Sequence, residues 1–116
     1  MQASRRRATP DADLINLALM FLVLLRHSGP EWDLAQPMDQ QSKWREHADY
    51  MDELVDAGVI ILGGPLDAVR VVLAIEADSE ETIRDILARD PWSETHLVVD
   101  TVDAWSLRLD GRKARR

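Results

Sequence analysis

The sequence contains no cysteine, and only 5% of its residues are aromatic. The lack of cysteine excludes disulfides, thiolate metal ligands and a cysteine nucleophile at once. The apolar run at residues 14–25 is interrupted by Asn16 and is shorter than the ~20 residues that cross a bilayer. Neither a Gly-rich dinucleotide fingerprint nor a phosphate-binding loop is present. The sequence therefore excludes thiol chemistry and disfavours membrane spanning and nucleotide binding through these motifs.

Positive charge is also scarce, because 14 basic residues stand against 21 acidic ones, a formal net charge of −7. The distribution is uneven: residues 20–111 carry 7 basic and 19 acidic groups, whereas residues 112–116 carry four basic groups and no acidic one. An acidic body repels a phosphate backbone, so we expect no nucleic-acid partner.

What the sequence does contain is typical of one soluble domain. Its 116 residues are 46% hydrophobic and 30% charged, which are ordinary globular values. We expect an N-terminal extension at residues 1–19 that is flexible or a non-native start, a folded domain at 20–110 and a solvated basic tail at 111–116. The basic residues before the first apolar run resemble a signal peptide, but no small-residue cleavage site follows the run. We therefore predict a cytoplasmic protein with no membrane partner.

Apolar residues follow two different periods along the chain. Continuous or alternating apolar runs predict strands at residues 20–27, 59–62, 70–76 and 95–109, the last with a bulge where its parity slips. Apolar steps of three and four predict helices at 40–57, closed by Gly58, and from Asp78 or Ser79 to Pro91. Gly63-Gly64-Pro65 predicts the turn between the second and third strands.

This order of elements predicts an α+β fold of the ferredoxin-like βαββαβ type, with an antiparallel sheet and two helices on one face. The strands at residues 20–27 and 70–76 are apolar at both parities. Two helices cover one face only, so the other face would expose a large apolar patch. We therefore predict a homodimer that packs sheet on sheet.

The residues best placed for chemistry are His47 and Asp90. His47 lies in the apolar stripe of the first predicted helix, three residues after Trp44, so its imidazole points toward the sheet. Asp90 lies on the inner side of the second helix at its last turn, where the helix dipole disfavours a carboxylate. If the two side chains converge, the carboxylate fixes the tautomer of the ring and raises its basicity. The alternative is a satisfied core histidine beside a helix-ending aspartate.

Other side chains are candidates for binding a ligand. Arg26 ends the first strand and would either clamp a substrate carboxylate or pair with an acid. Gly64 and Pro65 belong to a segment that would present backbone N–H groups to an oxyanion or simply form a turn. An apolar pocket would be lined by the large aromatic residues, or these would be core: Trp32, Trp44, Tyr50, Trp92 and Trp105. His27, His47 and His96 lie in different predicted elements without ligand spacing, so we expect neither a metal nor another cofactor.

The pattern of these residues resembles a known family. Arg45, His47 and Tyr50-Met51, then Gly63 to Leu66, then Asp90-Pro91-Trp92, and Trp105 near the end, are similar to the YCII-related proteins of the dimeric α/β barrel superfamily. The resemblance covers Met20 to about Leu109. It implies a ferredoxin-like protomer, a homodimer and an active site on a His–Asp pair, which falls here on His47 and Asp90. One branch of the family is associated with dehydrochlorination of a chlorinated hydroxyquinol, and the superfamily includes muconolactone isomerase.

Three interpretations follow. The first is a small-molecule enzyme of the isomerase, dehydrochlorinase or hydrolase class, in which His47 and Asp90 perform acid–base chemistry on a small aromatic or lactone substrate. Its substrate-binding residues would be Arg26, Trp44, Tyr50, Gly64, Pro65 and Trp92. The second is a non-catalytic metabolite-binding or accessory protein with the same pocket. In the third, the two residues only hold the helices together.

Overall fold

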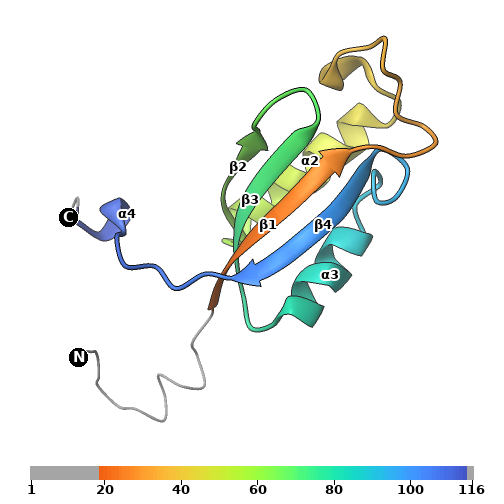
Figure 1. The fold of residues 1–116 in the computed structure, drawn as a ribbon. Helices are drawn as coiled ribbons and strands as arrows, with labels where there is room; N and C mark the ends of the chain where they lie inside the picture. Colours follow the sequence, from red (N-terminus) through yellow and green to blue (C-terminus); the bar gives the residue numbers. More distant parts are fainter. Residues whose placement is uncertain (1–18, 115–116) are drawn as a thin grey trace.

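A computed structural model describes residues 19–114 of the chain. The elements in chain order are β1 (Leu19–His27), the 3-10 helix η1 (Met38–Gln40), α2 (Trp44–Asp56), β2 (Ile60–Pro65), β3 (Arg70–Ala77), α3 (Glu80–Ala88), β4 (Leu97–Ala104) and α4 (Gly111–Ala114). All strand pairs are antiparallel, in the sheet order β2-β3-β1-β4 (Figure 1). The predicted α+β, ferredoxin-like fold is confirmed. The N-terminal extension lies outside the described residues apart from Leu19, as does the end of the basic tail.

The two long helices bury one face of the sheet. In Figure 1 the sheet faces the viewer and α2 passes behind it. Along β1, Phe21, Val23 and Leu25 alternate with less buried residues, and these three side chains are at most 5% exposed. Leu24, which points to the other face, is 36% exposed. β1 is therefore central to the core on one side and open to the surroundings on the other.

The helix ends follow the local sequence. Ser79 caps α3, because its side chain accepts a hydrogen bond of 3.1 Å from the N–H of Thr82. Gly58 follows α2 with φ +78°, a left-handed conformation that glycine adopts without strain. α2 begins at Trp44 rather than at residue 40, because a separate 3-10 turn precedes it and Lys43 takes a left-handed conformation.

The turn predicted at Gly63-Gly64-Pro65 is wrong, because these residues extend β2 instead. β2 is the edge strand of the sheet, so the missing N–H of Pro65 removes no hydrogen bond needed by a neighbour. A Cβ on Gly63 would stand 2.5 Å from Cδ2 of Leu73, so glycine lets the core side chain of β3 pack against the strand. The turn lies at residues 66–69, where Asp67 accepts the N–H groups of Val69 and Arg70.

The last strand is shorter than predicted. β4 ends at Ala104, not near residue 109, although the predicted bulge is present: the pairing with β1 shifts between Leu24 and Leu25, and Asp100 is the extra residue. After Trp105 donates its N–H to Met20, the chain leaves the sheet as an arm that ends in α4 (Figure 1). Among residues 19–114, none of the helices has the length and apolar character to span a membrane.

Candidate functional site

His47, in the first turn of α2, is in contact with Asp90, which lies just after the end of α3. Nδ1 of His47 lies 2.8 Å and 3.0 Å from the two carboxylate oxygens of Asp90. Both residues are buried, with 8% and 5% of their surfaces exposed. Because a carboxylate only accepts, Nδ1 carries the hydrogen of this bond, and Nε2 is the other ring nitrogen. Within residues 19–114, Nε2 has no hydrogen-bond partner.

Asp90 is held in place by the turn that ends α3. The helix stops at Ala88, two residues before Asp90, since Pro91 follows and disfavours a helical conformation of its predecessor. One carboxylate oxygen accepts the backbone N–H of Trp92 at 2.9 Å, an Asx turn that fixes the side chain. The same carboxylate therefore orients His47 and positions Trp92.

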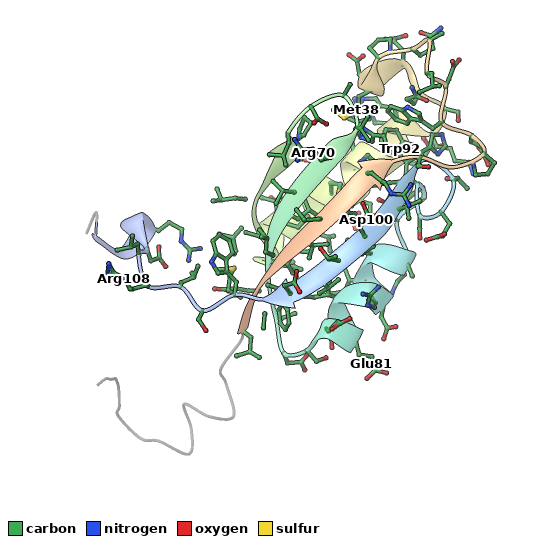
Figure 2. All side chains as sticks on the ribbon, in the orientation of Figure 1. Met38, Arg70, Glu81, Trp92, Asp100 and Arg108 are labelled. Carbon is green, nitrogen blue, oxygen red and sulfur yellow. The ribbon has the colours of Figure 1, made fainter. Side chains whose placement is uncertain are left out.

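Trp92 is the centre of an aromatic stack. It is fully buried and lies between two parallel imidazoles: His47 with a centroid distance of 4.0 Å, and His96 at 4.9 Å. The indole N–H donates to the carbonyl of Ser42 at 2.9 Å. Figure 2 shows Trp92 at the end of the sheet where β1 finishes. The stack fixes one face of the His47 ring.

The other two histidines occupy distinct settings around this tryptophan. Both ring nitrogens of His96 are engaged, by Ser42 Oγ at 2.8 Å and by Thr95 Oγ1 at 2.8 Å, and burial lowers the pKa of His96. His27 stacks on Trp32 with centroids 4.2 Å apart. Nδ1 of His27 lies 3.3 Å from the carbonyl of Ala68, and burial lowers the pKa of His27.

The sequence does not reveal that all three histidines gather around Trp92. They come from β1, α2 and the segment before β4, and their spacing carries no common period. The one signal that would have brought the three histidines together is the predicted fold, which places all of them at the same end of the sheet. Within the described part of the chain, no group of three or more His, Cys, Asp or Glu side chains is arranged to hold a metal ion.

A pocket of about 660 Å³ lies between α2 and the β2–β3 pair. His47 lines it together with His27, Arg45 and Asp52. The rest of its wall is apolar or glycine: Met38, Trp44, Ala48, Met51, Val55, Ile60, Ile61, Leu62, Gly63, Gly64, Pro65, Val71, Leu73 and Leu97. Its size is that of a small-molecule site, with few polar groups to orient a ligand.

Three of the residues predicted to bind substrate line this pocket, namely Trp44, Gly64 and Pro65. Trp92 does not line the pocket, but its ring stacks on the ring of His47. Tyr50 donates its hydroxyl to the carbonyl of Ile86 at 2.6 Å, which joins α2 to α3, and burial raises the pKa of this phenol.

Arg26 lies elsewhere, because its position in β1 points it to the open face of the sheet. There its Nε lies 2.8 Å from Oδ1 of Asp100, the bulged residue of β4. Of the two alternatives that the sequence leaves open, the structure shows pairing with an acid. Trp105 is 43% exposed and lies outside the wall of the pocket.

Comparison with known proteins assigns the chain to a family. The model of the YCII-related domain matches residues 20–103, which is well over half of the chain. No curated protein and no solved structure matches the chain. The matched range begins within β1 and ends within β4, so it contains all but the first and last residues of the sheet, both long helices, His47 and Asp90. The chain therefore belongs to the YCII-related domain family.

Proposed function

We propose that this protein is a small-molecule enzyme in which His47 transfers protons and Asp90 orients it. The observation that carries the proposal is that His47 both lines the 660 Å³ pocket and gives its Nδ1 to a buried carboxylate. The hydrogen bond leaves the other ring nitrogen for a ligand. An imidazole oriented in this way is a general base or acid.

His47 and Asp90 are sufficient for a complete proton-transfer cycle. A lone pair on Nε2 takes a proton from a carbon or hydroxyl of the ligand, or from water, and the Asp90 carboxylate stabilises the imidazolium that forms. Returning the proton to another ligand atom completes an isomerisation. In an elimination, loss of chloride from the adjacent carbon forms the double bond, and Nε2 then passes its proton to water, which restores the neutral ring. In hydrolysis the hydroxide attacks and the proton goes to the leaving group.

The walls of the pocket favour a flat, mostly apolar substrate. Trp44, Met38 and Met51 contribute large apolar surfaces, and His27 is the other imidazole that lines the space. An apolar environment strengthens the few polar contacts that a ligand makes there. These features support an aromatic or lactone substrate, in agreement with the chemistry associated with the family.

Turnover of a panel of chlorinated hydroxyquinols and lactones tests the proposal. We expect His47→Gln to lower kcat/KM of an accepted compound by at least about 10²-fold. Asp90→Asn should give a similar loss, since its amide donates to Nδ1 and thereby moves the ring hydrogen to Nε2. The matched control is Asp49→Asn. Asp49 is an exposed carboxylate on α2, the helix of His47, and it does not line the pocket.

Binding and turnover of the same compounds distinguish an enzyme from a binding module. A protein that binds panel compounds without converting them would favour the non-catalytic interpretation. A structural role for the pair alone also has an observation behind it, since Asp90 bonds the backbone of Trp92 as well. In that case both variants would lower the melting temperature and leave turnover unchanged. Full turnover by His47→Gln would refute the proposed enzyme.

We further propose that two copies pack through the open face of the sheet. β1 and β3 place Leu22, Leu24 and Val72 on this face, and the Arg26–Asp100 ion pair lies on the same side. Burial of such an apolar surface contributes about 25 cal/mol per Å². Light scattering should therefore give the mass of a dimer at micromolar concentration.

A charge placed in the middle of that face should dissociate the two copies. We expect Leu24→Lys to shift the mass toward that of a monomer. Leu34→Lys is the control, because Leu34 is 93% exposed and belongs to the loop after β1 rather than to the sheet. A wild-type protein of monomeric mass would contradict the proposed dimer and leave the acid–base proposal standing.

A further inference from the structure

We propose that a second subsite next to His27 takes a neutral apolar extension of the ligand, so that the substrate is a two-part, elongated molecule. This inference rests on the proposed function, because it assigns the part of the ligand that does not react at His47. It concerns a surface that the resemblance and the family match leave unassigned.

The subsite is a hollow of about 360 Å³ beside the main pocket. Three residues line both spaces, so the two lie next to each other: His27, Met38 and Pro65. The rest of its wall comes from the loop after β1 and from the β2–β3 turn: Trp32, Leu34, Gln36, Pro37, Asp67, Ala68 and Val69. A ligand that fills both spaces passes His27.

Both walls of the hollow are fixed before any ligand arrives. On one side Gln41, which is 4% exposed, bonds the loop: its Oε1 accepts the N–H of Asp33, and its Nε2 donates to the carbonyls of Asp33 and Gln36. Trp32 is held flat against His27 by stacking. A preformed site loses less conformational freedom on binding.

The opposite wall is held by Asp67. Its carboxylate accepts the N–H groups of Val69 and Arg70, at 2.9 and 2.6 Å, and the side chain of Arg70. These bonds, the one from the Arg70 N–H first, lower the pKa of Asp67 to about 2. The hydrogen bonds of Asp67 therefore hold the turn at neutral pH, where the carboxylate is ionised, and they place Val69 beside the hollow.

The chemistry of the hollow selects the extension. Leu34 is 93% exposed and Val69 50% exposed, so apolar side chains stand at the rim where a ligand would cover them. Neither Lys nor Arg lines the hollow, and the fully charged carboxylate there is Asp67. An anionic extension, such as a phosphate or carboxylate, would find no cation lining the hollow, and Arg70 is already paired with Asp67, whereas an alkyl or aryl group gains contact with Trp32, Pro37 and Val69.

A series of 4-alkylphenols, from phenol to 4-pentylphenol, tests the subsite by calorimetry. The ring occupies the main pocket, and each added methylene extends toward the hollow. A fully buried methylene strengthens binding by about fourfold, and in a half-open hollow we expect about two- to fourfold per carbon. Val69→Asp should abolish this gain while phenol itself binds as in the wild type.

Leu66→Asp is the matched control, because Leu66 is 54% exposed in the same turn region and lines neither space. It should keep the full dependence on chain length. A gain per methylene that is equal in Val69→Asp and wild type refutes the subsite, and so does binding of phenol without any gain for longer chains. If neither phenol nor its longer homologues bind the wild type, the proposed main pocket fails as well, which separates the two failures.

Discussion

Replacement of Asp90 tests how much the buried carboxylate contributes to the fold. It accepts the Nδ1–H of His47 and the backbone N–H of Trp92, and only 5% of its surface is exposed. Asp90→Ala leaves both donors buried without a partner. Hydrogen bonds to a charged acceptor contribute about 1.5–3 kcal/mol each, so we expect the free energy of unfolding to fall by about 3–6 kcal/mol.

Asp90→Asn is a milder perturbation. The amide oxygen still accepts the N–H of Trp92, and the amide nitrogen donates to Nδ1 of His47 once the ring hydrogen moves to Nε2. We expect a loss of about 1 kcal/mol, because two buried bonds survive in neutral form. The two variants thus differ in stability, while both remove the carboxylate that fixes the tautomer of His47.

Urea unfolding followed by far-ultraviolet circular dichroism measures these losses at one fixed protein concentration, which matters if the protein associates. Asp49→Ala is the control: Asp49 pairs with Arg45 at 3.4 Å with both side chains exposed, and such pairs contribute about 0–1 kcal/mol. A loss below about 1 kcal/mol for Asp90→Ala would refute the argument that the carboxylate satisfies two buried donors.

Three further predictions address other parts of the fold. Gly29→Ala should lower the free energy of unfolding by more than about 2 kcal/mol, because φ is +121° and the new Cβ would stand 2.5 Å from the carbonyl oxygen of Thr95. Gly64→Ala, whose Cβ would meet nothing within 4 Å, is the control in the same urea titration, and equal losses would contradict the reasoning. Tyr50→Phe should cost about 0.5–1.5 kcal/mol by removing the 2.6 Å bond to α3, and an unchanged urea midpoint would argue against that bond. The lowered pKa of His96 means that the unfolded chain binds more protons, so this residue's contribution to stability is complete above about pH 6.5 and falls as the pH drops below it. Unfolding at pH 7.5 and 5.5 should show a smaller difference for His96→Gln than for wild type, and equal differences would contradict this assignment.

The pattern of apolar residues predicted most of the fold. The apolar run of β1 and the helical steps around His47 predict a strand and an amphipathic helix, and the structure has both, with one of the two faces of β1 buried. The bulge in β4 was also within reach, because a parity slip is a local feature. These features succeed because burial imposes a period on the sequence.

The segment at Gly63-Gly64-Pro65 shows where local patterns fail. Glycine and proline are typical of turns, yet here the edge position of β2 tolerates proline, and the core side chain of Leu73 occupies the space beside Gly63. Both reasons depend on neighbours in space. The stack of His47, Trp92 and His96 is tertiary in the same way, since no spacing along the chain encodes it.

The sheet order also has a consequence for how the chain folds during synthesis. β1, the first strand, lies between β3 and β4, so each of its two ladders pairs it with a strand made much later. On the ribosome β1 has no partner until β3 begins to emerge at residue 70, and its second edge waits for β4, which begins at residue 97. Its apolar residues are exposed throughout that interval, and closing these long loops costs entropy before any contact offsets it. We therefore expect the sheet to close only after β4 has emerged from the ribosome, so that the apolar residues of β1 are available to chaperones during this interval.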